Sequence, residues 1–256
     1  MASFEVQVEA LTSLDIASSD SAPTQAQLTQ FLTDGAKEVI NALPGSMLAL
    51  CASQETFTST EPGSESETLN TSKILNVFRN DGDIDQPCRQ INSENKGRVS
   101  NESDMSYAKI TDPVYYIENN KINVLPSGGS CKYSEVAYPA VAYDATAIAS
   151  FPDEAEYLVA LYASVKALQN KMGSMSDEIP RNSDQDGTHG AALTSTQGYE
   201  KVRNYIEVEE DTELSSATIA SLSSEMQQFV AEYQWYQGQQ AKLEADYEKG
   251  LQRLRT

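Results

Sequence analysis

The chain has few of the residues from which most enzymes and metal sites are built. It contains three cysteines and one histidine in 256 residues. Cys51, Cys88 and Cys131 are far apart and form no Cys-x-x-Cys pair, so the sequence indicates neither a disulfide framework nor a zinc site. His189 stands beside Gly190, in a polar segment that offers no rigid base next to a nucleophile. We therefore predict a non-enzyme without catalytic, metal-binding or cofactor-binding residues.

Long apolar runs are also missing. A membrane span needs roughly 18 uninterrupted apolar residues, and even the stretch 114–125 is broken by four polar residues at 118–121. The first residues, Met-Ala-Ser-Phe-Glu, lack the basic and apolar regions of a signal peptide. The sequence predicts no membrane contact and synthesis in a cytoplasm.

Positive charge is scarce. The chain has 18 basic and 38 acidic residues, a net charge of −20, and Lys37 is the only basic residue before Lys73. An acidic surface repels phosphate, which argues against sequence-specific DNA binding. Such a surface lets nucleic acid slide past or meets a basic partner, and solubility alone is the simpler alternative.

Two motifs that suggest chemistry fail on inspection. The run 81–85, Asp-Gly-Asp-Ile-Asp, begins like a calcium loop, but Gln86 replaces the glycine at its sixth position and Asn92 replaces the glutamate at its twelfth. The run 127–130, Ser-Gly-Gly-Ser, lies between two expected strands and does not open a helix, so it is no phosphate loop. A hydrolase stays open only as a remote alternative.

The predicted fold class is mainly α with a β insertion (α+β). Residues 1–72 are expected to supply a short strand at Phe4, Val6 and Val8, a helix near 24–43, a short helical or buried segment at 47–51, and a polar loop at 53–72. Residues 149–256 are expected to complete a helical bundle. They contain a helix that starts at Pro152 and stops at Gly173, a flexible loop at 173–198, and a long C-terminal helix from about Ser215.

Residues 73–148 are predicted to form a small antiparallel β-domain. Short β-like runs occur at 74–78, 89–92, 114–117, 122–125 and 133–138, and the third and fourth are expected to form a hairpin around a four-residue loop. This hairpin is apolar on both faces, whereas an exposed one-sided hairpin alternates. We therefore predict that it contacts neighbouring subunits or tail components through Tyr115, Tyr116, Ile122 and Val124.

The C-terminal helix carries a heptad-like apolar seam. From Ile219 to Tyr236 the spacings alternate between three and four residues, and the seam resumes at Leu243 and continues to Leu254. A seam of this length exceeds what one small core uses, so we predict that its distal half meets another protein. The alternatives are a helix that folds back on its own bundle or a coiled coil of like copies. The predicted interface residues are Tyr233, Trp235, Tyr236, Leu243, Tyr247, Leu251, Arg253, Leu254 and Arg255.

One segment resembles a known family. Residues 149–168, Ala-Ser-Phe-Pro-Asp-Glu-Ala-Glu-Tyr-Leu-Val-Ala-Leu-Tyr-Ala-Ser-Val-Lys-Ala-Leu, are similar to a passage in head-to-tail adaptor (neck) proteins of tailed bacteriophages, where a Phe-Pro-Asp start leads into a helix rich in Leu, Tyr and Ala. The order of the preceding segments is also similar, including a hairpin strand that reads Ile-Asn-Val-Leu-Pro. The resemblance covers roughly residues 30–172; the last 80 residues and the loop at 173–198 have no counterpart in it.

The resemblance implies a structural role in a virion neck. Such adaptors form a homo-oligomeric ring, commonly of twelve subunits, that binds the portal protein of the capsid and tail or further neck proteins, and the genome DNA passes through its channel. By this resemblance the C-terminal element is expected to bind the portal. The alternative within virions is a tail or fibre-attachment module, which would form trimers or bind a fibre.

Overall fold

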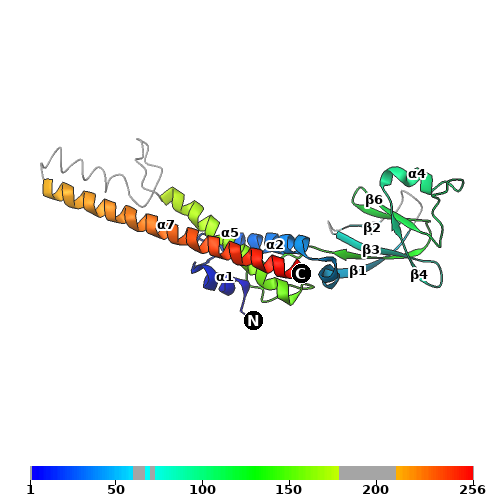
Figure 1. Ribbon diagram of the computed structural model, residues 1–256, viewed down its shortest axis with the longest axis horizontal. Helices are drawn as coiled ribbons and strands as arrows, with labels where there is room; N and C mark the ends of the chain where they lie inside the picture. Colours follow the sequence, from blue (N-terminus) through cyan, green and yellow to red (C-terminus); the bar gives the residue numbers. More distant parts are fainter. Residues whose placement is uncertain (1, 60–66, 70–72, 179–211, 256) are drawn as a thin grey trace.

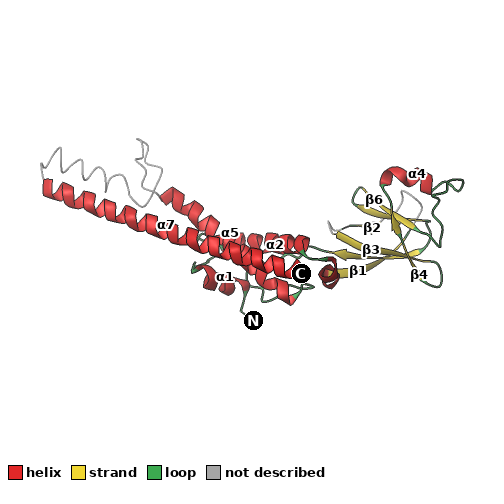
Figure 2. Ribbon diagram, viewed as in Figure 1, coloured by secondary structure: helices red, strands yellow, loops and turns green. Residues whose placement is uncertain are grey.

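The computed structural model describes residues 2–59, 67–69, 73–178 and 212–255. The molecule is elongated, with helices along one part and a β-region at the other end (Figure 1). Helices and a largely antiparallel β-structure occupy separate stretches of the chain, which confirms the α+β class (Figure 2). The fold therefore has two parts with different architectures, which meet where the short helix α3 (Gly45–Leu48) leads into the first strand.

The N-terminal segment is helix α1 (Phe4–Thr12), so the predicted strand is wrong. Ser3 caps the helix by accepting a hydrogen bond from the Val6 amide. Phe4 and Val8 are buried while Val6 is half exposed. Alternation over three residues suited a strand, but the stripe that is buried has the four-residue spacing of a helix packed on α5.

Helix α2 (Gln25–Ala42) confirms the helix predicted near 24–43. Thr24 and Gln27 form a capping box in which the Thr24 hydroxyl accepts from the Gln27 amide and the Gln27 side chain accepts from the Thr24 amide. Leu43 ends the helix just before Pro44. The short helix α3 and the turn Ala49–Cys51 follow, as expected for a short helical segment.

Helix α5 (Asp153–Glu178) is the central helix of the apolar core, and it packs against α1, α2 and α7 (Thr212–Arg255). It does not stop at Gly173 as predicted, because Gly173 is tolerated inside a helix that packing supports. Residues 173–178 of the predicted loop are thus helical, and 179–198 lie outside the described residues. The helix α7 has 44 residues, about 66 Å at 1.5 Å per residue.

The β-region consists of two four-stranded sheets that share a core. One has the order β1 (Ala52–Thr58), β8 (Ser130–Val136), β3 (Lys73–Asn80), β4 (Asp85–Pro87). The other has the order β2 (Glu67–Thr68), β7 (Lys121–Leu125), β6 (Val114–Glu118), β5 (Arg89–Gln90). Side chains of both sheets meet in one cluster that includes Val77, Tyr115, Val124 and Tyr133.

Three details of the β-region differ from the prediction. The first strand, Ala52–Thr58, covers the start of the segment 53–72 that was predicted as a polar loop. Most of its side chains are exposed, so it shows no apolar pattern, and it is held by backbone pairing with β8 and by the packing of Phe57 against Tyr133. The short strand β5 pairs with β6 in parallel. The hairpin turn has two residues, since Glu118 and Lys121 pair as strand residues, and Asn119 and Asn120 both adopt positive φ as a type I′ turn requires.

Candidate interaction surface

The C-terminal half of α7 packs on the chain's own core. Tyr236 and Leu243 are buried, and Tyr247, Leu251 and Leu254 pack against the same cluster as α2 and α5. For these side chains the structure favours the alternative of a helix folded back on its own chain. Tyr233 and Trp235 of the predicted interface are exposed, and contact of this helix with another protein stays a prediction. These side chains are buried because α7 packs antiparallel to α5 (Figure 1). An apolar seam in the sequence shows that a helix face will be covered, but not whether its own chain or another protein covers it.

The cations at the end of α7 also serve local contacts. Lys249 lies 3.5 Å from Asp246 one turn earlier, and Arg253 lines a shallow groove of about 380 Å³ with Leu158, Leu161 and Leu254. The side chain of Arg255 lies outside the described part of the chain. Because the groove is bordered by charges of both signs on α5 and α7, it gives no clear preference for the charge of a partner.

The N-terminal half of α7 is exposed and apolar along one face. It extends beyond the described end of α5 (Figure 1). Ile219, Met226, Val230 and Tyr233 lie within about 60° of each other around a helix with 3.6 residues per turn. Their side chains are exposed by 53, 40, 47 and 38%. Among the described residues, these four lie along one side of the helix. We call them the α7 stripe, a candidate interaction surface.

Charge is almost missing from this half of the helix. Between Glu213 and Lys242 the only charged residues are Glu225 and Glu232. Glu232 accepts a hydrogen bond from the Tyr236 hydroxyl at 3.3 Å. In a chain with a net charge of −20, this segment carries little of the negative charge that would repel an acidic partner.

The hairpin β6–β7 is covered by its own chain, so its predicted role at a subunit interface is wrong. Tyr115, Tyr116, Ile122 and Val124 are all buried. One face of the hairpin, with Tyr115 and Val124, fills the core between the two sheets. The other face, with Tyr116, packs under the segment around the short helix α4 (Lys96–Val99). Apolar residues on both faces thus reflect two intramolecular layers.

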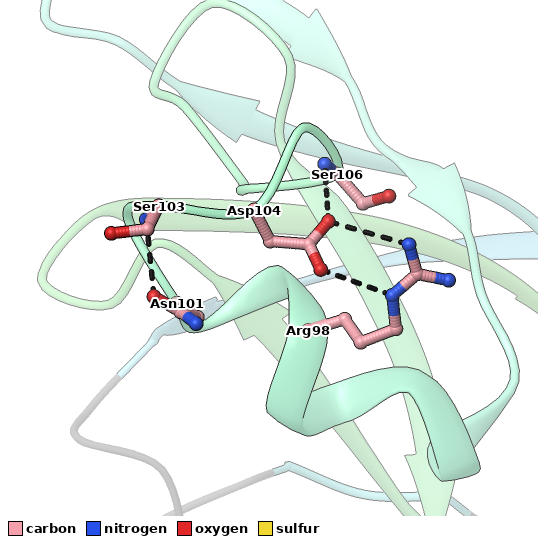
Figure 3. Close-up of polar contacts among 5 residues, drawn as sticks. All are labelled: Arg98, Asn101, Ser103, Asp104 and Ser106. Atoms are coloured by element: carbon pink, nitrogen blue, oxygen red, sulfur yellow. Dashed lines mark hydrogen bonds and ion pairs between the residues drawn. The ribbon is translucent and has the colours of Figure 1, made fainter.

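A loop after α4 presents an apolar side chain at the far end of the β-region. Asp104 accepts from the Arg98 guanidinium at 3.1 Å and from the Ser106 amide at 2.8 Å, while Asn101 accepts from the Ser103 amide (Figure 3). The hydrogen bonds from Ser106 and Arg98 hold the pKa of Asp104 below its ordinary value, the Ser106 amide contributing most. Met105, next in the chain, is fully exposed. This ordered loop is a second, smaller candidate for contact with a partner.

The acidic run at 81–85 forms a turn. Asp81 accepts from the amides of Asp83 and Ile84 and from the Gln86 side chain, which lowers its pKa to about 2. Asp85 pairs with Lys132 at 2.7 Å. The described residues contain no group of three or more His, Cys, Asp or Glu side chains placed to hold a metal ion. His189 lies outside the described ranges.

None of the helices in the described part of the chain is long and apolar enough to span a bilayer.

Sequence reasoning missed the α7 stripe as a separate surface. It grouped Ile219 and Met226 with Tyr236 and Leu243 in one seam. The structure separates them. Tyr236 and Leu243 are buried in the core that contains α5, whereas Ile219 and Met226 are exposed to solvent. The change from Gln, Ser and Ala before Lys242 to Lys, Glu and Asp after it was the available signal.

No protein-family model matches the chain, and no curated protein matches it.

Proposed function

We propose that this chain is a non-catalytic virion protein of a tailed bacteriophage, located in the neck. Copies of it form a ring that joins the capsid portal to the tail and lines the channel for the genome DNA. The proposed architecture is a helical bundle with a long C-terminal helix and a β-domain inserted in it. The resemblance of residues 149–168 to neck proteins suggests the family.

The α7 stripe is the observation that carries this proposal. A monomer that acts alone has no use for four exposed apolar side chains aligned along a helix that leaves its own core. A subunit of an assembly requires such a surface. The β-region at the other end of the molecule places a second potential contact far from the first (Figure 1), which suits a protein that bridges two neighbours.

The charge of the chain supports passage of DNA without binding. A channel lined by acidic side chains repels the phosphate backbone at short range and does not trap it. Lys and Arg number 18 against 38 acidic residues. Sequence-specific recognition requires the opposite balance, so the DNA would move past this protein and make no fixed contacts with it.

The test is assembly of the purified full-length chain. Native mass spectrometry and negative-stain electron microscopy are expected to show closed rings, and these rings are expected to bind the isolated portal protein of the same virion. A matched variant, Val230→Glu, is expected to remove rings and portal binding while leaving the circular dichroism spectrum unchanged. A chain that remains monomeric at high concentration, with and without the portal protein, would contradict the proposal.

A tail or fibre-attachment module is the second candidate. The observation in its favour is Met105, fully exposed on a loop held by the Arg98–Asp104 ion pair at the end of the β-region. If this loop were the main contact, Met105→Ser would abolish partner binding and Val230→Glu would have no effect. The two variants therefore discriminate between the candidates.

A further inference from the structure

Residues 92–112 connect β5 to β6 and lie over the outer face of the β6–β7 hairpin (Figure 1). We call them the cover segment. It contains the turn Ser93–Asn95 and helix α4, and the rest is made of turns and irregular backbone. Of its side chains, only those of Val99 and Ala108 are buried, and the Ala108 amide donates to the Val99 carbonyl at 2.9 Å. The cover segment is thus held down by two small apolar side chains.

Three larger side chains of the hairpin lie beneath the cover segment. Val114, Tyr116 and Leu125 are 0, 3 and 7% exposed, and together with the two buried residues of the cover segment they form a small apolar cluster of their own. The opposite face of the same hairpin belongs to the separate core between the two sheets. Removal of the cover segment would therefore expose the first cluster and leave the contacts of the second in place.

Both ends of the cover segment are anchored at the same place. Arg89 of β5 pairs with Val114 of β6, and the Arg89 amide donates to the Pro113 carbonyl at 2.9 Å. The Arg89 guanidinium also lies 3.2 Å from the Asp112 carboxylate. The chain therefore leaves the sheet and returns to it at adjacent residues. Because the loop is closed in this way, it can separate from the sheet without breaking a strand pair.

Between these anchored ends, one ion pair connects the cover segment to the hairpin in the described part of the chain. The Lys96 ammonium lies 2.9 Å from both carboxylate oxygens of Glu118. These side chains are 52 and 39% exposed. Ion pairs with this exposure contribute little stability and weaken as salt is added. The Arg98–Asp104 pair is internal, so it orders the cover segment without fixing it to the sheet (Figure 3).

We propose that the cover segment opens as a unit by local unfolding while both sheets stay folded. The hairpin face formed by Val114, Tyr116 and Leu125 then passes between a covered and an exposed form. Segments with few buried apolar contacts open at a free energy below that of global unfolding. The Lys96–Glu118 pair is the latch of the closed form. This device belongs to the β-region and operates whether or not the chain forms a ring.

Thiol labelling of the full-length Ala108→Cys variant tests the opening. The new thiol reports the cover segment, whereas native Cys131 is buried in the core between the two sheets and reports that core. Each thiol is labelled with iodoacetamide and located by peptide mass spectrometry, and its rate is divided by its rate in the unfolded chain. The new thiol is expected to react at least about tenfold faster than Cys131.

Urea below the unfolding transition separates the two kinds of opening. A local opening exposes little surface and therefore depends weakly on denaturant, whereas opening of the core depends on it strongly. The labelling rate of the new thiol is expected to stay nearly constant while that of Cys131 rises. Hydrogen exchange of the native chain gives the same comparison without a new thiol, since the Ala108 amide is expected to exchange faster than the amides of β8 after correction for intrinsic rates.

Lys96→Gln in the Ala108→Cys variant tests the latch. Loss of an exposed ion pair is expected to raise the labelling rate of the new thiol about 1.4- to 5-fold. Added sodium chloride is expected to raise this rate when Lys96 is present and to have little effect after Lys96→Gln. Lys132→Gln is the matched control, because it removes the Lys132–Asp85 pair of the first sheet, and it is expected to leave the rate unchanged.

Other outcomes overturn the inference. Equal corrected rates for the new thiol and Cys131, with equal dependence on urea, would mean that the cover segment opens only when the whole β-region unfolds. Equal effects of Lys96→Gln and Lys132→Gln would reject the latch. If the Ala108→Cys variant does not fold, hydrogen exchange of the native chain decides, and an Ala108 amide that exchanges no faster than the amides of β8 would reject the opening.

Discussion

Leu158 of α5 and Gly250 of α7 lie in close contact. Leu158 is buried, and a Cβ atom added at Gly250 would collide with its Cδ2 methyl group. Glycine inside a helix costs roughly 1 kcal/mol relative to alanine. The glycine at 250 is therefore retained in spite of its helix propensity, because it lets the two helices approach at this point.

Leu158→Ala is expected to lower the free energy of unfolding by about 2–5 kcal/mol, the range for a buried leucine. The change in the free energy of unfolding caused by Gly250→Ala is expected to be more favourable, by at least about 1 kcal/mol, in the Leu158→Ala variant than in the native chain. The reason is that Leu158→Ala removes the methyl group with which the new Cβ atom at position 250 would collide. Urea denaturation of the four proteins in this cycle measures both effects. Additive effects would show that the two residues do not touch.

Asp81 provides a prediction about pH. Its carboxylate accepts hydrogen bonds mainly from the Ile84 and Asp83 amides and then from Gln86, and its pKa falls to about 2. Since the folded pKa lies below the unfolded one, the stabilisation of the turn is complete above the unfolded pKa and is lost as pH falls toward about 2. Asp81→Asn is expected to speed hydrogen exchange of these two amides at neutral pH. Equal exchange in both proteins would refute this.

At the scale of elements, helix α2 approaches α5 closely at one position. A Cβ atom at Gly35 would lie 2.9 Å from the Tyr162 ring, whereas at Gly173 of α5 it would meet nothing within 4 Å. Both glycines are in helices, but only the first is required by packing. The same amino acid thus has a steric role in one helix and none in the other.

Gly35→Val is expected to destabilise the protein by about 1–3 kcal/mol, because the Tyr162 ring must leave its position. Gly173→Val is the matched control and is expected to change the free energy of unfolding by no more than about 0.5 kcal/mol. Thermal or urea unfolding followed by circular dichroism measures both. Equal costs at the two positions would place the α2–α5 contact elsewhere.

The elements that the sequence predicts well are those with a long period or a clear cap. Helix α2 has a capping box and α5 begins with Pro152 and three acids, so both were predicted close to their true start. Strand β1 was missed because Ser53, Gln54 and Glu55 are exposed and carry no apolar pattern. The sequence also does not show which surface covers an apolar face, because a hairpin face buried within the chain and one buried at a subunit interface have the same composition. Only the fold shows that Tyr116 packs against residues of its own chain.

At the scale of the whole molecule, the β-region leaves and rejoins the helical part at one place. Ala52 of β1 is paired with Val136 of β8, and Ser53 is paired with Glu135. The chain therefore exits and returns on adjacent antiparallel strands. Two of the three apolar clusters lie within the β-region, and the third joins the helices with residues at the base of these strands. The two parts hence have largely separate cores.

This topology predicts that the helical part folds and assembles without the β-region. Replacing residues 54–134 by Asn-Gly would join Ser53 to Glu135 through a two-residue turn, the connection that a paired antiparallel register accepts. The shortened chain keeps the contacts of Val136 and Cys51 with the helices. It is expected to unfold in a single cooperative transition and to form the same oligomer as the full chain, since the α7 stripe is untouched. Native mass spectrometry of both proteins compares their subunit numbers. A shortened chain that is folded but monomeric would place the assembly surface in the β-region.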